Sequence, residues 1–447
     1  MPIGNLDISG IGKEVVMAVI WQSHMYNAAF SAGILLIAST SEYMGVLTKN
    51  PKYDRFAHGG AIASILTFAT GSFIPIVGLL MLITLYPVFW SNLQNIMFWP
   101  LFAEAWMFVG EIILIYAWYA SWEKLAYRKK LHIVLGFLAA IFVVFQFTLI
   151  NVVGSYLLTP TIGAEPTNVG AVYLNPTFVP LNMHRFVGNI SFVGFVVAGY
   201  AGLRYLRSTR QEKREYYDWM GHWGLIWGFG FLLLQPIIGF GYLKSIREQN
   251  TPAFEYIMLG DKAWLFNLLA IELAIMGVAS VAYCLHKIRF ASRPMPTLRN
   301  MTMGALGFMG LFSFLNVVPA EMSLVPQIGW VFFDGYDTKI PLGGMYPWKY
   351  LGLIGLMLVG VFALALYLKA TTGGFHWGRA SRWSQYALIA TAVTVLATMA
   401  TMGYTRETAR RGAEPGYLIA GCMTLEQQVV ASGCPDAPGR TAERGTP

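Results

Sequence analysis

Apolar residues fill ten long stretches of the chain, and polar or charged residues gather in the segments between them. Each stretch has about the 20 apolar residues that an α-helix needs to cross the hydrocarbon core of a bilayer. The pattern predicts an all-α fold, an integral membrane helical bundle with about ten transmembrane helices. The predicted spans are residues 14–47, 57–86, 97–122, 132–158, 181–206, 220–243, 262–286, 301–318, 347–369 and 383–404.

The composition excludes a soluble fold. Hydrophobic residues make up 56% of the chain and charged residues 12%, with a mean hydropathy of +0.52, whereas charged residues reach about 25% in soluble domains. Nineteen of the 31 Lys and Arg residues follow spans one, three, five, seven and nine. Because basic loops stay in the cytoplasm, we expect a multi-pass protein of the inner (plasma) membrane with both termini extracytoplasmic. The net charge of +8 reflects this topology and does not indicate nucleic acid.

The cysteines and the start of the chain narrow the chemistry further. No CxxCH sequence occurs, which argues against covalent c-type haem, and no CxxC pair indicates zinc or an iron–sulfur cluster. Cys422 and Cys434 either form a disulfide in an extracytoplasmic tail or stay reduced. The polar start lacks the basic region of a signal peptide, so we expect the first helix to direct membrane insertion.

Three ionisable residues, His24, Glu104 and Glu111, lie inside predicted spans. A charged side chain costs at least about 2.5–3.5 kcal/mol at mid-bilayer, so such residues indicate a functional site. At about 1.5 Å per residue, all three lie in the outer half to the middle of the membrane. His184 and Glu407 fall at a similar level. These residues therefore predict metal or cofactor binding, proton movement, or both.

The same residues admit other interpretations. His24 could be a hydrogen-bonded core histidine, and the two glutamates could form a proton path without a cofactor or a neutral hydrogen-bonded pair between helices. No predicted span contains two histidines, which excludes the bis-histidine four-helix cytochrome b pattern and favours haems held by single ligands from several helices. The remaining histidines map to cytoplasmic ends or loops and are not assigned as ligands: His58, His132, His222, His286 and His376.

Several short motifs, in order along the chain, resemble subunit I of the cytochrome bd-type oxidases. The resemblance covers residues 14–243 and 347–411 and rests on the order and spacing of the motifs together. These motifs are IWQSHMYNAAFSAGILLIASTSEYMGVLT around His24, TFATGSF at 67–73, PLFAEAWMFVGE with the two glutamates, GSYLLTP at 154–160, NPTFVPLNMHRFVG with His184, and GYTRETAR at 403–410.

The resemblance implies two to three haems, b-type with a d-type haem as an alternative, and a role for each site residue. His24 would be the axial ligand of a high-spin haem, Glu407 the carboxylate ligand of the other high-spin haem, and His184 a ligand of the low-spin haem b. Glu104 and Glu111 would act catalytically, as a haem-associated carboxylate and a proton-transfer group. Arg410 and Lys349 complete the predicted cofactor-binding set.

The chain also departs from the family pattern. The acidic pair is seven residues apart instead of the usual eight, which turns the second carboxylate by about 100° around the helix. The methionine ligand of the low-spin haem has no clear counterpart, with Met345 or Met357 as substitutes. The long hydrophilic quinol-binding loop is missing, and the family's GRQPW sequence is replaced by ARRGAEP. Quinol oxidation at the usual site is therefore not expected.

These observations predict four segments: a haem-binding bundle (1–243), two helices in place of the quinol loop (244–346), C-terminal transmembrane helices (347–411) and an extracytoplasmic polar tail (412–447). The main hypothesis is a multi-haem redox subunit, a terminal oxidase-like oxidoreductase that passes electrons from quinol or a periplasmic cytochrome c to an oxygen-reducing haem. One alternative is a haem-b electron conduit between quinone and a periplasmic partner. Another is a haem-free transporter or structural subunit. Further membrane subunits are expected as partners.

Overall fold

The computed structural model of the chain describes residues 12–159, 173–258, 262–317 and 347–412. Cys422 and Cys434, whose pairing the sequence left open, lie outside these residues, as do the substitute ligand Met345 and nearly all of the polar tail. Within them the chain is helical, with the following elements in order: α1 (Lys13–Thr48), α2 (Pro51–Gly71), α3 (Phe73–Leu85), α4 (Pro87–Ile96), α5 (Phe98–Ala120), η1 (Ala126–Arg128), α6 (Lys129–Leu158), α8 (Phe178–Arg207), α9 (Gln211–Leu232), α10 (Gln235–Gln249), α11 (Thr251–Met258), α12 (Ala263–Arg289), α13 (Pro296–Val317), α15 (Pro347–Thr371) and α16 (Arg382–Gly412).

The predicted membrane-spanning architecture is confirmed. Ten helical segments of the described chain are long and apolar enough to cross a membrane, and each overlaps one of the stretches predicted from the sequence. Two spans are built from two helices each, since α2 continues into α3 at Ser72 and α9 continues into α10 just before Pro236. At the second junction, Pro236 lacks a backbone N–H donor and therefore interrupts the regular helix.

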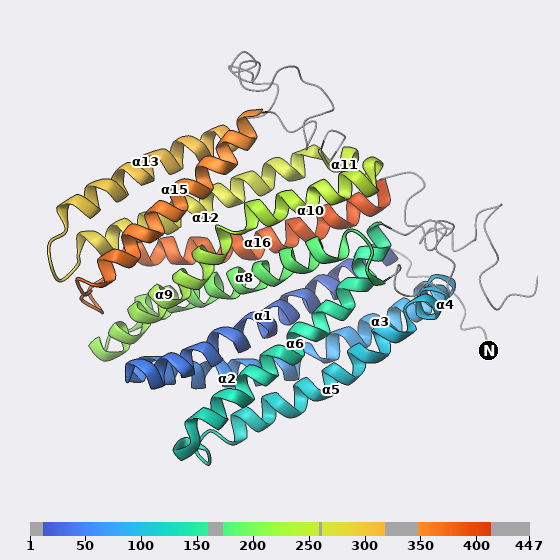
Figure 1. Cartoon of the computed structure of the whole chain (residues 1–447), viewed down its shortest axis with the longest axis horizontal. Coiled ribbons are helices and arrows are strands. Elements are labelled where there is room, and N and C mark those ends of the chain that lie inside the picture. The colour runs from blue at the N-terminus through green and yellow to red at the C-terminus, as the bar shows by residue number, and fades with distance from the viewer. Residues whose placement is uncertain (1–11, 160–172, 259–261, 318–346, 413–447) are drawn as a thin grey trace, which may run out of the picture.

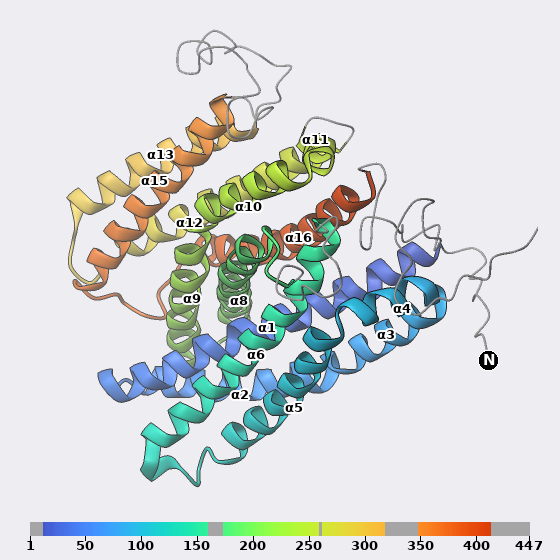
Figure 2. The same ribbon diagram turned by 45° about the vertical axis from the view of Figure 1, so that its right-hand side comes forward.

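The helices run side by side, and α8 lies at the centre of the bundle (Figure 1). It packs most closely against α9, α16 and α1. In both views α13 and α15 lie on one side of α8, while α2, α3 and α5 lie on the other (Figures 1 and 2). The chain enters α1 and leaves α16 at the same end of the bundle, called here the terminal end (Figure 1, right).

Glycine allows the central helices to approach each other closely. A Cβ atom added to Gly194 in α8 would lie only 2.1 Å from the backbone nitrogen of Gly228 in α9. Only a residue without a side chain can occupy that point of contact, as in the small-residue interfaces of other membrane helices. The glycines therefore fix the distance between α8 and α9.

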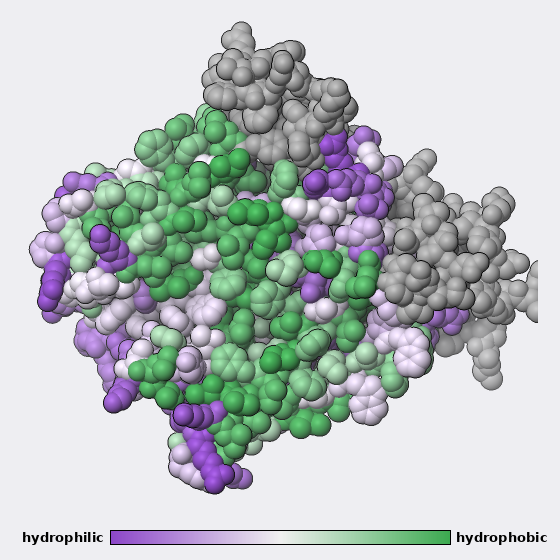
Figure 3. Space-filling model, in the orientation of Figure 1, coloured by the Kyte–Doolittle hydropathy of each residue, from purple (hydrophilic) through white to green (hydrophobic). Residues whose placement is uncertain are grey.

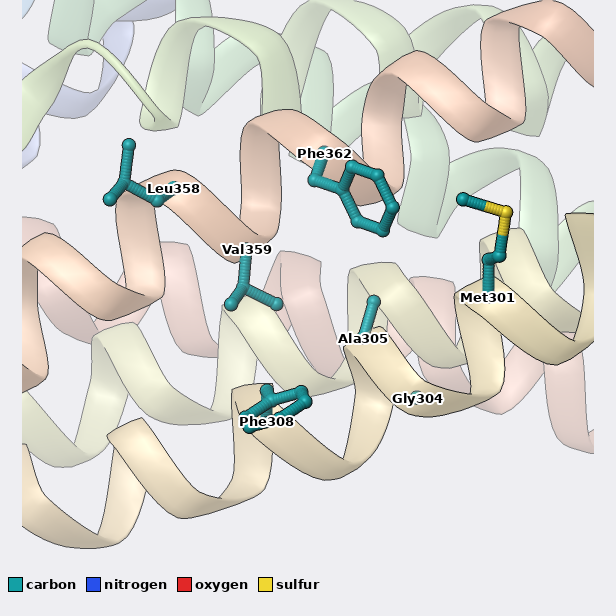
Figure 4. Close-up of a pocket in the computed structure, with 7 residues that line it drawn as sticks. All are labelled: Met301, Gly304, Ala305, Phe308, Leu358, Val359 and Phe362. Carbon is teal, nitrogen blue, oxygen red and sulfur yellow. The ribbon is translucent and has the colours of Figure 1, made fainter.

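Hydrophobic residues cover most of the visible face of the bundle, and hydrophilic residues collect toward its ends (Figure 3). A shallow hollow on this apolar surface lies between α13 and α15, with Phe308, Leu358 and Phe362 among its walls (Figure 4). No ionisable side chain lines it. Such a surface suits contact with lipid chains.

Candidate functional site

The middle of α1 is accessible on every side, although α1 packs against α2, α3, α6 and α8. Each of the eight residues Trp21–Ala28 is half-buried, whereas most residues that follow on the same helix, from Ala29 to Ser41, are buried. A helix packed on one face would alternate between buried and exposed positions. The stretch around His24 is therefore less tightly packed than the part of α1 that follows it, although Gln22 and Asn27 meet glycines of neighbouring helices.

His24 and His184 both have a ring nitrogen available for a ligand. The Nδ1 atom of each is buried and has no hydrogen-bond partner among the described residues. The ring of His24 meets the edge of Trp21 with centroids 5.9 Å apart, and the ring of His184 stacks on Tyr242 at 5.8 Å. Both imidazoles thus have aromatic neighbours but keep an unused polar atom inside the protein, which is unusual for a purely structural histidine.

Two other buried histidines show the contrast. His132 contacts a carboxylate oxygen of Glu42 through Nδ1 at 2.6 Å and the carbonyl oxygen of Trp118 through Nε2 at 2.8 Å. His222 contacts the hydroxyl of Tyr367 through Nδ1 at 2.6 Å. Both ring nitrogens of His132 and the Nδ1 atom of His222 thus form hydrogen bonds within the protein. The buried Nδ1 atoms of His24 and His184 form none with the described residues.

A half-buried arginine, Arg185, directly follows the candidate ligand His184 in α8. Its Nη1 atom donates a hydrogen bond to Oδ1 of Asn151 in α6, and Asn151 in turn donates from Nδ2 to Asn182 at 2.8 Å. Sequence reasoning missed both residues: Arg185 lies within the motif around His184 but was given no role there, and Asn151 lies outside the quoted motifs.

α16 reaches the same region from a different direction. Its backbone carbonyls at Leu396 and Met399 accept hydrogen bonds from Tyr26 at 2.8 Å and Gln22 at 3.4 Å, both in α1. Farther along α16, the guanidinium of Arg406 packs against Gly154 of α6, 2.3 Å from where a Cβ atom would stand. α16 therefore carries its last turns, and with them the half-buried Glu407, past α1 and onto α6.

The carboxylates of α5 lie on its buried stripe. Glu111 is 3% exposed and lies in line with the fully buried Ile115 and Trp118. Glu104, two turns earlier, accepts a hydrogen bond from Nε2 of Gln146 in α6 at 3.0 Å, and its charge acts on Glu111. The spacing of seven residues thus keeps both carboxylates on the side of α5 that faces the bundle.

These positions group the predicted residues around α6. His24 and Glu111 belong to α1 and α5, which both pack against α6. Arg185, next to His184, and Glu104 each share a hydrogen bond with a residue of α6. The side chains of Arg410 and Lys349 are not among those described, although their backbones belong to α16 and α15. α15 packs mainly on α12 and α13, and the roles of Arg410 and Lys349 stay predictions.

Two ionic networks that sequence reasoning did not predict lie at the other end of the bundle. The carboxylate of Glu42 is fully buried and accepts hydrogen bonds from Lys129 at 3.0 Å and from Trp118 at 3.2 Å, besides its contact with His132. Lys287 pairs with Asp218 at 3.0 Å in a second buried site. A sequence places each of these groups near a helix end, and only packing reveals that they are buried together.

A third buried carboxylate, Glu272 in α12, also escaped the sequence analysis. It is 5% exposed and accepts a hydrogen bond from Thr401 of α16 at 2.8 Å. Its position within the seventh predicted span was the available signal, because ionisable residues in such spans are rare.

The described residues contain no group of three or more His, Cys, Asp or Glu side chains arranged around one point. A bare metal ion held by protein ligands alone would need such a group. A haem iron needs only one or two protein ligands, so single histidines on separate helices fit a haem.

The comparisons with known proteins give a family and a fold. No curated protein sequence matches the chain. Among solved structures, the bd oxidase from Geobacillus thermodenitrificans has a similar fold, with a TM-score of 0.62 and 16% sequence identity over 94% of this chain and 90% of that chain. The family description of cytochrome bd terminal oxidase subunit I matches residues 14–254. Because this match spans more than half of the 447 residues, the protein belongs to the cytochrome bd terminal oxidase subunit I family.

Proposed function

We propose that the chain is the haem-binding subunit of a bd-type terminal oxidase, in which His24 and His184 hold haem iron. The available ring nitrogens at membrane depth are the observation that carries this proposal. Family membership supplies the class of chemistry, oxidoreduction with haem in a membrane. The haem-free transporter considered from the sequence finds no support in that family.

Five of the predicted residues then have a proposed role. His24 and His184 would each provide one axial ligand, and Glu407, on the last turns of α16, would provide a carboxylate ligand to a further high-spin haem. When bound, haem supplies one-electron chemistry and, at a high-spin iron, an open position for oxygen. Glu104 and Glu111 would hold protons and move them through the apolar interior, where water does not reach.

The orientation and partners are part of the proposal. Because basic loops stay in the cytoplasm, both termini would lie outside it, and the terminal end of the bundle, with His24, His184 and Glu407, would lie toward the outer face. Electrons would come from quinol or from a periplasmic cytochrome c, and further membrane subunits would cover the exposed apolar helices.

Spectra of histidine variants test the ligand assignments. A reduced-minus-oxidised spectrum of the purified wild-type protein should show haem. His24→Ala should lose the high-spin signal and His184→Ala the low-spin signal, because each removes an iron ligand. His376→Ala is the matched control, since His376 is exposed in a loop and its loss should leave both signals intact. Wild-type spectra in both ligand variants would show that the iron is held elsewhere.

An electron conduit without oxygen reduction is the second candidate. Helices α10, α11 and α12 follow one another from Gln235 to Arg289 with only short connections, so this part of the chain has no long hydrophilic loop of the kind that binds quinol. Oxygen consumption separates the two functions. Haem bands without oxygen uptake from any donor would favour the conduit, and donor-driven uptake would favour the oxidase.

A further inference from the structure

Six tryptophan and tyrosine side chains form a continuous series along α9 and onto α8. Their ring centroids follow one another at 5.8, 6.4, 6.1, 5.4 and 6.4 Å. Aromatic rings interact at centroid separations of about 4.5–7 Å, so each ring is a direct neighbour of the next. The series, called here the aromatic ladder, consists in order of Trp227, Trp223, Trp219, Tyr216, Tyr217 and Tyr200.

Packing alone does not account for the residue types in the aromatic ladder. Phenylalanine would fill much of the same space, and it is the commonest aromatic residue of the chain, with 29 copies against 14 of tryptophan. The Nε1 atom of Trp227 is buried and has no hydrogen-bond partner among the described residues. An unpaired buried donor costs stability, a cost that phenylalanine would avoid. Tryptophan and tyrosine differ from phenylalanine in a second way, because they give up an electron far more readily.

The inner end of the aromatic ladder lies on the side of the candidate site. Phe231 stacks on Trp227 at 5.6 Å and leads along α9 toward α10. In α10, Nε2 of Gln235 donates a hydrogen bond to the carbonyl oxygen of His184 at 3.0 Å. Gln235 comes eight residues after Trp227, a rise of about 12 Å along a helix axis. An electron crosses a separation of this size in one tunnelling step.

The outer end of the aromatic ladder reaches the surface. Tyr216 and Tyr217 are buried, whereas Tyr200 is 48% exposed. The 30 residues of α8 span about 45 Å, more than the hydrocarbon core of about 30 Å. Tyr200 lies seven residues before the end of this helix, near the level where tyrosines turn their hydroxyl toward water. The last ring of the ladder is therefore accessible to molecules in solution.

A positive charge lies beside the last two rings and does not oppose their oxidation. The guanidinium of Arg204 is 5.3 Å from the ring centroid of Tyr217 and 5.9 Å from that of Tyr200. A tyrosine that loses an electron also releases its phenolic proton, so the radical that forms is neutral. The arginine repels a cation but not this neutral product, and it therefore favours release of the proton.

We propose that the aromatic ladder carries single electrons from Tyr200 inward and so removes oxidising equivalents left by incompletely reduced oxygen. This inference rests on the proposed function, because it requires a haem at His184. Reduction of one hydrogen peroxide to two waters takes two electrons and two protons. Each electron that leaves Tyr200 yields a neutral tyrosyl radical and releases one proton, so two such events balance the reaction.

A soluble thiol restores Tyr200 after each electron transfer. The thiol gives one electron and one proton to the tyrosyl radical, and two thiyl radicals then combine to one disulfide. One hydrogen peroxide and two thiols thus yield two waters and one disulfide. In the orientation proposed above, Tyr200 lies toward the cytoplasm, where thiols are kept reduced.

Spin trapping tests the relay in the purified full-length protein with its haem. A nitroso spin trap adds to protein radicals at the surface, and mass spectrometry of peptides locates the adduct. Hydrogen peroxide should give an adduct on Tyr200, and glutathione should prevent it. Trp223→Phe interrupts the ladder with a ring that resists oxidation, so the adduct should fall to background. Tyr386→Phe is the matched control, since Tyr386 is also 48% exposed but its ring meets Trp383, and the Tyr200 adduct should stay.

A second variant separates electron transfer from a change in packing. Tyr217→Phe deletes only the hydroxyl of the ring next to Tyr200, so it should abolish the adduct without loss of haem even if Trp223→Phe fails to fold. A Tyr200 adduct at the wild-type level in Tyr217→Phe would overturn the inference. A haem-containing wild-type protein without an adduct on Tyr200 would overturn it as well. A wild-type protein without haem would instead refute the proposed function.

Discussion

At the scale of single residues, partners decide what an ionisable group inside the membrane can do. Glu42 is held by Lys129, His132 and Trp118, so its charge stabilises the packing of α1, α5 and α6. Glu111 is equally buried but lies beside another carboxylate, Glu104, and no described residue donates a hydrogen bond to it in the structure. We therefore keep the proposal that Glu111 takes up and releases a proton.

Glu111→Gln should therefore slow proton delivery while leaving the haems in place. Oxygen consumption per haem should fall by about 10²-fold or more, the contribution typical of a positioned proton donor. The measurement is oxygen uptake with excess donor, normalised to haem absorbance. Glu123→Gln, which alters an exposed loop glutamate near the end of α5, should keep the wild-type rate. A full rate in Glu111→Gln would exclude this carboxylate from the proton path.

At the scale of helices, close backbone contact holds the central elements of the bundle in register. α8 meets α9 at Gly194 and Gly228, and it meets α16 at Gly199, where an added Cβ atom would stand 2.2 Å from the Cβ of Ala392. His184 and Arg185 belong to this same helix. The position of the candidate site therefore depends on how tightly α8 packs against its neighbours.

Gly194→Ala should destabilise the protein by at least about 1–3 kcal/mol, because the new methyl group meets backbone atoms that cannot move independently. The thermal unfolding midpoint in detergent should fall, and the haem bands should be lost at the same temperature. Gly241→Ala is the matched control: nothing lies within 4 Å of its added Cβ, and alanine favours a helix over glycine by about 0.5–1 kcal/mol. Equal midpoints for the two variants would contradict a close contact at Gly194.

At the scale of the whole molecule, the bundle has two chemically different ends. The helices alternate in direction, so His24, His184 and Glu407 all lie in the half nearest the terminal end although they belong to α1, α8 and α16. The ionic networks of Glu42 and Asp218 lie toward the opposite end, close to the basic loops. The predicted redox residues are thus separated from the structural ion pairs along the membrane normal.

Reporter fusions test the orientation of these ends. Alkaline phosphatase, which is active only outside the cytoplasm, should be active when fused after residue 412. A fluorescent protein that folds only in the cytoplasm should be fluorescent when fused after residue 209, between α8 and α9, or after residue 376. The reverse pattern would place the candidate site toward the cytoplasm and would refute the outward orientation.

The sequence by itself determined the fold class and the number and positions of the spans, and with them that His24, Glu104 and Glu111 lie inside spans. These properties follow from hydropathy and from the regular rise of a helix, and both are local. Which ring nitrogens stay available, which carboxylates are paired, and how Arg185 and Arg406 meet on α6 were decided only by the tertiary structure. Those features depend on contacts between helices far apart in the chain, and neither periodicity nor charge counting contains that information.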